Sequence, residues 1–232
     1  EHFFDGYEAN PEFSLRAIEA AVVNGATHLV LCDTNGGALP TDVYRVVAEV
    51  KSHVGDDAVI GIHCHDDTGC AVANSMAAVE AGAGHVQGTL NGLGERTGNT
   101  NLTTVIPNLQ LKLGYTCLPD GRIERLTSVS HHVAETLNRA VNPQAPYVGS
   151  SAFAHKAGLH VSAIVRAKDA YEHVNPELVG NGTRFVVSEI DGRATLQMKA
   201  DEIGIEYEGE AINQVVDDIK RLEHAGSHIE AA

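Results

Sequence analysis

Short apolar segments alternate with helix-spaced apolar positions over the first 114 residues. Residues 28–32, 59–64 and 85–90 are largely continuous apolar segments, the pattern of buried parallel strands. Segments with apolar residues three or four positions apart lie between and after them, which is the spacing of an amphipathic helix. The opening residues 1–5 have the composition of a further strand. The pattern therefore predicts four strand–helix units and a parallel sheet covered by helices.

Residues with defined roles at helix ends support this arrangement. Asn10 and Pro11 form a helix start, in which an N-cap amide precedes proline at the first helical position. A second helix is expected from Pro40, and a fourth over residues 102–113. The glycines expected to close the first three helices are Gly25, Gly55 and Gly84. The expected apolar faces carry Leu15, Ile18 and Val22 in the first helix, Val43, Val46, Val47 and Val50 in the second, and Val72, Met76 and Val79 in the third.

The alternation stops after residue 114. The rest of the chain is predicted to contain, in order, a turn at 119–121, a helix at 123–140, an extended linker at 142–146, a short strand at 185–187, and helices at 194–203 and 212–224. We therefore divide the chain into an α/β part, residues 1–114, and a mostly α-helical subdomain, residues 115–232.

Composition and charge exclude several classes of protein. The 232 residues are 43% hydrophobic and 20% charged, with a formal net charge of −15, so a nucleic-acid-binding surface is not expected. No apolar run approaches the roughly 18 residues of a membrane span, and no signal-peptide pattern occurs. The four cysteines lack metal-motif spacing and indicate reduced thiols of a cytoplasmic protein. Because the chain opens without methionine and within a predicted element, we expect a fragment of a longer protein.

Two histidines mark the strand at 59–64. His63 and His65 are two residues apart, so on a strand their side chains project to the same face. Two imidazoles held side by side are a good start for a divalent-metal site. The alternative is a pair of histidines that caps the strand with hydrogen bonds.

Polar residues cluster at the ends of the last three predicted strands, at residues 33–35, 63–66 and 91–99. A (β/α)8 barrel places its active site at this end of its strands. A doubly wound sheet does the same. The residue pattern therefore leaves two possibilities, half of a barrel or a small open α/β domain.

Three ordered motifs carry a family resemblance. Residues 31–37 (LCDTNGG), 61–69 (GIHCHDDTG) and 91–99 (NGLGERTGN) resemble consecutive motifs of the Claisen-condensing synthases in the DRE-TIM metallolyase superfamily. Other segments, at 1–7, 147–163 and 171–180, most resemble the citramalate synthase branch, with 2-isopropylmalate and homocitrate synthases as close relatives. The resemblance implies the C-terminal half of a TIM (β/α)8 barrel, strands 5–8, followed by the helical subdomain.

The resemblance also implies a reaction. The expected activity is an acyl transfer in isoleucine biosynthesis, the metal-assisted condensation of acetyl-CoA with pyruvate. A different 2-oxo acid, 2-oxoisovalerate or 2-oxoglutarate, is the alternative. The family's lyases carry a catalytic cysteine after the eighth strand; residues 92–97 contain none, which favours condensation over cleavage.

The family's roles can be assigned to individual positions. His63, His65 and Asn99 match its ligands to a divalent ion, which could be Mn, Zn, Co or Mg. Thr34 is implied to hold the carboxylate of the 2-oxo acid, with a helix-capping hydroxyl as a compatible alternative. Taken alone, Asn99 would be an ordinary turn residue.

Two further positions are implied to act in proton transfer. Glu1 matches the acid/base glutamate of the fifth strand, and His160 matches the last histidine of an H-K-A-G-x-H motif. That histidine moves a proton or polarises the thioester, often in the partner subunit's site, which implies a homodimer with subdomain exchange. The acidic residue that relatives often carry two positions later is replaced by Ser162. Taken alone, His160 would be a surface histidine.

One motif of the family is missing. Its first strand supplies a metal-binding aspartate and an arginine that polarises the keto oxygen, and no matching stretch occurs in the sequence. We therefore predict that the isolated chain lacks measurable synthase activity. A non-catalytic half-barrel that assembles with itself or with a complementary half is the second hypothesis, and a simple binding module is the weakest.

Overall fold

The computed structural model describes residues 1–156, 172–186, 196, 200, 204–205 and 209–226. The chain forms two compact units. The first contains residues 1–119 and 132–139, and the second contains residues 120–131 and 140–232.

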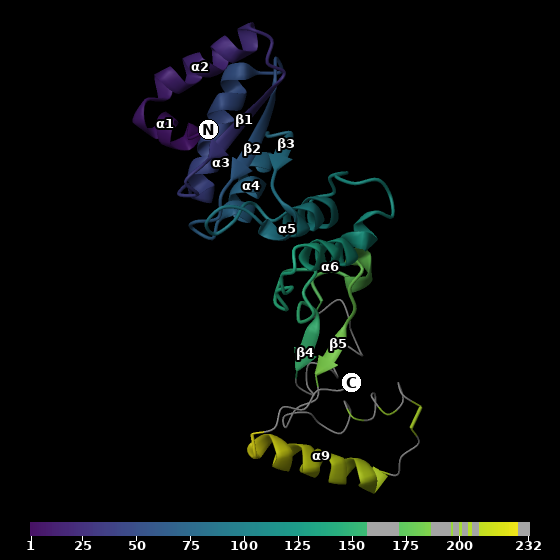
Figure 1. Ribbon diagram of the computed structural model, residues 1–232. Helices are drawn as coiled ribbons and strands as arrows, with labels where there is room; N and C mark the ends of the chain where they lie inside the picture. Colours follow the sequence, from purple (N-terminus) through teal and green to yellow (C-terminus); the bar gives the residue numbers. More distant parts are fainter. Residues whose placement is uncertain (157–171, 187–195, 197–199, 201–203, 206–208, 227–232) are drawn as a thin grey trace. The chain divides into compact units, whose positions relative to one another are not determined.

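A three-stranded parallel sheet organises the first unit (Figure 1). Its strands β1 (His28–Asp33), β2 (Val59–Cys64) and β3 (His85–Gln87) lie side by side in chain order. The parallel α/β sheet that the sequence predicts is therefore confirmed, although β3 is shorter than expected. The register aligns Cys32 with His63 and His63 with Gln87. These three residues form one row across the sheet.

The opening of the chain is a helix and not the predicted strand. Helix α1 (Phe3–Ala9) buries Phe4 and Tyr7, which are three residues apart, and the rings of Phe3 and Tyr7 lie 5.8 Å apart. Five residues are too few to distinguish a strand from a helix by periodicity, and only Tyr7 reveals the helical spacing. Three strand–helix units follow, instead of four.

The next two helices begin and end as expected. Helix α2 (Pro11–Val23) has Asn10 as its N-cap, and the Asn10 side chain accepts a hydrogen bond of 3.0 Å from the N–H of Phe13. Helix α3 (Pro40–Val54) buries all the predicted valines, together with Val54. Its end at Gly55 has a φ of +63°, a conformation that glycine adopts without steric cost.

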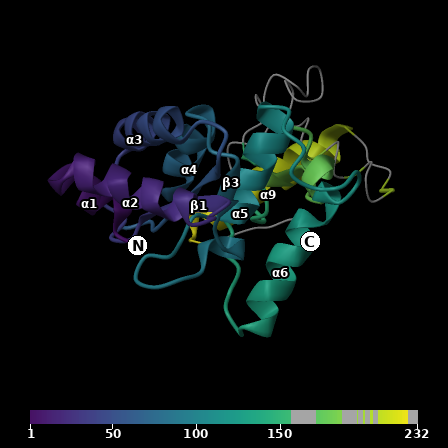
Figure 2. The same cartoon turned by 90° about the horizontal axis from the view of Figure 1, so that it is seen from above.

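Helix α4 (Ala71–Glu80) lies beside α3 (Figure 2). It also packs against β2, and its buried residues are small. Its fully buried positions are Ala71, Asn74, Ser75 and Ala78, whereas the expected face of Val72, Met76 and Val79 is only partly buried. Small side chains let the helix approach its neighbours closely, so the pattern of apolar residues alone does not identify its buried face. Gly82, with a φ of +108°, follows the end of α4, so Gly84 is not its terminator.

The predicted helix at 102–113 is two elements. Helix α5 (Leu102–Pro107) starts at Asn101, whose side chain accepts a hydrogen bond of 3.0 Å from the N–H of Thr103. It continues as a π-helix, η2 (Asn108–Lys112). Pro107 has no N–H to donate, so the α-helical hydrogen-bond ladder is interrupted where the wider turn begins. A short 3-10 turn, η1 (Leu90–Gly92), precedes α5.

After residue 119 the described residues are less helical than the sequence predicts. A 3-10 turn η3 (Ile123–Arg125) leads into helix α6 (Leu126–Thr136), which ends before the predicted residue 140. Strands β4 (Ala154–Lys156) and β5 (Arg184–Val186) form a parallel pair, and the 3-10 turn η5 (Pro176–Val179) precedes β5. Helix α9 (Gly209–His224) confirms the last predicted helix.

The predicted linker at 142–146 is a series of turns and not an extended segment. The N–H of Ala145 donates to the Asn142 carbonyl at 3.1 Å, and the N–H of Gly149 donates to the Ala145 carbonyl at 2.9 Å. The Asn142 side chain also accepts from the N–H of Gln144. Such side-chain turns compete with an extended conformation. The predicted helix at 194–203 falls almost wholly outside the described residues, and none of the described helices has the length and apolarity of a membrane span.

Candidate metal and substrate site

The candidate site lies at the carboxyl ends of β1, β2 and β3, where three loops are joined by backbone hydrogen bonds. The first two loops meet where the N–H of His65 donates to the Asp33 carbonyl at 3.2 Å and the N–H of Thr68 to the Gly36 carbonyl at 3.1 Å. The third loop joins where the N–H of Asp66 donates to the Gly98 carbonyl at 3.0 Å. The polar residues that follow the strands therefore belong to one continuous edge, as is usual for parallel sheets.

His63 and His65 project from that edge together. One face of β2 carries Ile60, Ile62 and Cys64, which are all fully buried. His63 lies on the opposite face and is only partly buried. The ring centroids of His63 and His65 are 5.4 Å apart.

Asn99 lies beside both histidines. Its Nδ2 atom is 3.0 Å from Nε2 of His63, and its backbone forms an isolated β-bridge with His65. The Nδ1 atom of His65 is buried and has no hydrogen-bond partner among the described residues. A buried imidazole nitrogen without a partner fits a metal ligand, because an orphaned polar atom is otherwise costly. Two imidazoles and one amide oxygen are suitable donors for a divalent ion.

These three residues alone are an incomplete coordination shell. Within residues that the structure describes, no cluster of three or more His, Cys, Asp and Glu side chains could hold a metal ion. The donor set therefore fits part of a metal site, to which further ligands must be added.

Two glycines let the loop after β3 close around Asn99. A β-carbon at Gly94 would collide with the Oδ1 atom of Asn99, and one at Gly98 would collide with the Gly92 carbonyl oxygen. Gly98 also has a φ of +107°. The side chain of Asn99 is thus placed by a tightly folded backbone that only glycine permits.

Arg96 ties the three loops to one another. Its guanidinium donates to both carboxylate oxygens of Asp67, at 2.8 and 2.9 Å, and to the Thr34 carbonyl at 2.8 Å. These hydrogen bonds hold the pKa of Asp67 below its usual range. A bidentate contact of this kind is geometrically specific as well as strong.

Thr34 and Glu1 approach the same loop from the start of the chain. The N–H of His2 donates to the Thr34 hydroxyl oxygen at 2.6 Å, and Glu1 is exposed directly before it. Thr34 does not cap a helix, because the N-cap of α3 is Leu39. His160 lies outside the described residues, so its relation to the site stays a prediction.

Asp33 is the most buried carboxylate of the edge. It is 1% exposed, and its oxygens accept hydrogen bonds from the N–H groups of Gly37 and Ala38 at 3.2 to 3.3 Å. Burial raises the pKa of Asp33, and these backbone hydrogen bonds partly oppose the rise. Burial also raises the pKa of the Cys64 thiol well above its usual range. Cys64 is therefore an inert core thiol.

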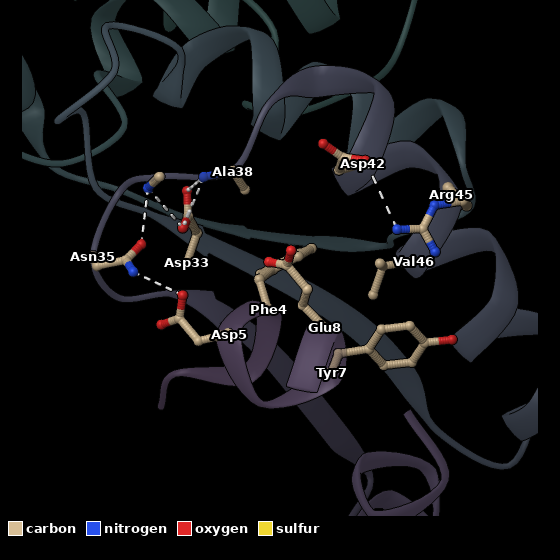
Figure 3. Close-up of a pocket in the computed structure, with 11 residues that line it drawn as sticks. Phe4, Asp5, Tyr7, Glu8, Asp33, Asn35, Ala38, Asp42, Arg45 and Val46 are labelled. Atoms are coloured by element: carbon tan, nitrogen blue, oxygen red, sulfur yellow. Dashed lines mark hydrogen bonds and ion pairs between the residues drawn. The ribbon is translucent and has the colours of Figure 1, made fainter. Parts of the chain in front are cut away.

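A separate acidic pocket of about 330 Å³ lies between α1, the loop after β1 and α3 (Figure 3). Asn35 donates to Asp5 at 2.7 Å on one side of it, and Arg45 pairs with Asp42 at 3.7 Å on the other. The two histidines and Asn99 are not part of its lining. Asp33 forms one of its walls, so the pocket adjoins the edge that carries the candidate site.

Sequence reasoning missed two partnerships of the site. Asp67 and Arg96 stand within the quoted motifs, but their pairing joins loops 29 residues apart. Gln87, whose Oε1 atom is 3.2 Å from Nδ1 of His63, stands in no motif. Only the register of β2 and β3 could have indicated it.

Comparison of the sequence with known families gives the class of protein to which the chain belongs. The sequence profile of the HMGL-like family matches residues 3–133, and that of the homocitrate synthase post-HMGL domain-like family matches residues 147–227. The chain is therefore a member of the HMGL-like family, within the DRE-TIM superfamily.

Individual relatives are more specific. The chain is 51% identical over its whole length to an (R)-citramalate synthase of Aquifex aeolicus and 53% identical to one of Streptomyces coelicolor. It covers 44% and 43% of those relatives, so it spans less than half of their length. Over 94% of the chain it is 39% identical to a homocitrate synthase of Methanopyrus kandleri, of which it covers 54%. Among solved structures, a hydroxymethylglutaryl-CoA lyase of Pseudomonas aeruginosa is 22% identical, with a TM-score of 0.48 over 54% of this chain and 43% of that one.

Proposed function

We propose that the chain is the second half of the catalytic barrel of a Claisen-condensing synthase, followed by its subdomain. The intact enzyme would condense acetyl-CoA with pyruvate to give citramalate and free CoA. The observation that carries this proposal is the meeting of His63, His65 and Asn99 at the carboxyl edge of a parallel sheet. The high identity to several citramalate synthases supports the choice of pyruvate.

In this proposal the two histidines bind one divalent ion through imidazole nitrogens, and Asn99 binds it through Oδ1. The bound ion (Mn, Zn, Co or Mg) would polarise the keto oxygen of the acid. Because His65 Nδ1 is buried without a hydrogen bond among the described residues, this histidine is able to give a nitrogen to the ion without breaking an existing contact there.

Thr34 is proposed to bind the carboxylate of the 2-oxo acid. Its hydroxyl oxygen already accepts a hydrogen bond from the N–H of His2, which leaves the hydroxyl hydrogen to be donated. Arg96 holds the Thr34 carbonyl, so the hydroxyl is presented from a fixed backbone.

Glu1 and His160 are proposed to move protons. One proton leaves the acetyl methyl group, and that carbon forms a bond to the keto carbon of the acid. The carbonyl electron pair moves to the keto oxygen, which takes up a proton. Water then cleaves the thioester, giving a carboxylate and free CoA. Carboxylate and imidazole side chains suit both proton transfers when their surroundings tune their pKa.

The assembly proposed with this function is a cytoplasmic homodimer in which subdomains are exchanged. The homodimer is supported by the resemblance alone, which implies that the histidine matched by His160 often serves the partner subunit's site. The alternative substrates are 2-oxoisovalerate and 2-oxoglutarate, favoured by identities of 38% to a probable 2-isopropylmalate synthase and 39% to a homocitrate synthase.

The test measures CoA release by the intact protein from acetyl-CoA with each of the three 2-oxo acids. Pyruvate is expected to give the highest kcat/KM. His63→Ala should lower it by more than about 100-fold, since even loss of a residue that supports a ligand costs about 10–100-fold. His132→Ala, at an exposed histidine of α6, is the matched control and should leave the rate unchanged. Full activity of the His63 variant would contradict the proposed site, and preference for another acid would contradict the substrate.

A further inference from the structure

We propose that Gln87 is a positioning residue for His63: it fixes the tautomer of that imidazole and so selects Nε2 as the nitrogen that binds the metal. The choice of Nε2 as the metal-binding nitrogen rests on the proposed function. The tautomer is a property of the protein without metal.

The two sides of the His63 ring meet partners of opposite kind. On one side, Oε1 of Gln87 is 3.2 Å from Nδ1. On the other, Nδ2 of Asn99 is 3.0 Å from Nε2. A carbonyl oxygen only accepts hydrogen bonds, and an amide nitrogen only donates them.

A neutral imidazole has one N–H and one lone pair, and these contacts assign both. The proton is on Nδ1, where Gln87 accepts it, and the lone pair is on Nε2, where Asn99 donates to it. The two contacts agree, so each amide supports the orientation of the other.

Backbone contacts hold all three side chains in register. Gln87 stands beside His63 in the parallel pairing of β2 and β3. The N–H of Thr100 donates to the Cys64 carbonyl, and the N–H of Thr89 donates to the Thr100 carbonyl, both at 2.9 Å. Thr100, which follows Asn99, is therefore hydrogen-bonded both to Cys64, which follows His63, and to Thr89, two residues after Gln87.

Gly88 permits this close approach. A β-carbon there would collide with the Thr100 carbonyl oxygen. The backbone next to Gln87 thus lies against the backbone next to Asn99. Gln87 is exposed, and its place in β3 fixes the backbone from which its amide reaches Nδ1 of His63.

This arrangement has a direct consequence for metal binding. A histidine ligand usually donates its second N–H to a hydrogen-bond acceptor, which orients the ring and raises the basicity of the ligating nitrogen. Gln87 is the acceptor of that kind for His63. The lone pair that Asn99 now meets at Nε2 is then the one offered to the ion, and Asn99 is able to join the same ion only through its Oδ1 atom.

The first test reads the tautomer without any metal. The whole protein, labelled with nitrogen-15 at histidine only and freed of metal by a chelator, is compared with Gln87→Met and Gln87→Glu by long-range proton–nitrogen correlation. His63→Ala identifies the His63 signals. The Nδ1–H form is expected in the parent protein and in Gln87→Glu, which keeps an acceptor. Its share should fall in Gln87→Met, where only the Asn99 contact still favours it. An Nε2–H form in the parent, or an unchanged tautomer in Gln87→Met, would overturn the proposal.

The second test titrates Co²⁺ and follows its visible absorption. Gln87→Met is expected to weaken Co²⁺ binding by about 10–100-fold, and Gln87→Glu should bind within a few-fold of the parent. Gln144→Met, at an exposed glutamine in a turn of the second unit, is the matched control and should change neither reading. Equal affinity of Gln87→Met and the parent would overturn the role of Gln87 in metal binding.

The two measurements separate this inference from the proposed function. If His63→Ala binds Co²⁺ as well as the parent does, the proposed metal site is wrong. The tautomer of the metal-free protein still decides whether Gln87 orients His63.

Discussion

Asn99 owes its position beside His63 to glycines that precede it. The side chain lies where a β-carbon of Gly94 would be, and Gly98 closes the loop in a conformation with positive φ. In this loop, glycine provides space for another residue's amide as well as backbone freedom.

Gly94→Ala should therefore damage the site more than the fold. The added methyl group displaces the amide of Asn99, and we expect at least a tenfold weaker affinity for Co²⁺, in the range found when residues supporting a ligand are altered. The melting temperature should change little, because Gly94 is exposed. Gly182→Ala is the matched control, since a β-carbon there meets nothing within 4 Å. Unchanged Co²⁺ affinity in Gly94→Ala would show that the position of Asn99 does not matter.

Residue chemistry was partly predictable from the sequence. The spacing of His63 and His65 indicated that their rings lie together, and the motif supplied Asn99. Gln87 could not be found, because its contact with His63, 24 residues away in the chain, depends on the pairing of β2 with β3. Side-chain partners across a sheet are set by register, which a single strand does not encode.

At the scale of elements, helix α3 shows the strongest agreement between sequence and structure. Its valines repeat at helical spacing and are all buried, with Val43, Val47 and Val50 at 0% exposure. Helix α4 follows another rule, since its buried face is made of small residues. Hydrophobic periodicity therefore predicts the buried face of a helix well when large apolar side chains fill the core. It predicts that face less well when small residues pack the helix closely against its neighbours.

Val47→Ala tests how much one position of α3 contributes. The change removes two buried methyl groups and leaves a cavity, so the free energy of unfolding should fall by about 1–3 kcal/mol. Val23→Ala, at a position 84% exposed at the end of α2, should cost less than about 0.5 kcal/mol. Urea unfolding of both variants gives the comparison. Equal costs would mean that α3 does not carry the core of the first unit.

The predicted strand at 1–5 shows why the element pattern failed at its first position. Phe3 and Phe4 are adjacent apolar residues, which suit a buried strand or a helix equally. The helix forms because Phe4 and Tyr7 share one buried face and α1 packs against β1. Packing in the folded protein therefore selected the helix over the strand, because the local sequence allows both.

At the scale of the whole molecule, the sheet of the first unit is open on both sides. Within the described residues, no further strand pairs with the outer edge of β1 or of β3. Unpaired edges of a parallel sheet recruit other strands, and three parallel strands are a small sheet. The second half of a barrel would have these edges where the first half completes it.

The isolated chain is therefore expected to associate with itself or with a polypeptide that supplies complementary strands. Size-exclusion chromatography with light scattering should give a mass above the 24.6 kDa of one chain. The isolated chain should release no CoA above background. A well-folded monomer would contradict the half-barrel proposal, and acetyl-CoA- and pyruvate-dependent CoA release by the monomer would contradict the predicted inactivity as well.

Arg96 makes the three loops at the carboxyl edge thermodynamically dependent on one another. Its guanidinium joins the backbone of Thr34 to the carboxylate of Asp67, two residues after His65. A ligand that orders one of these loops therefore reduces the conformational entropy that the other loops still lose when a second ligand binds. An acid held at Thr34 and an ion held at His63 and His65 would each tighten the binding of the other, and linkage requires the two enhancements to be equal.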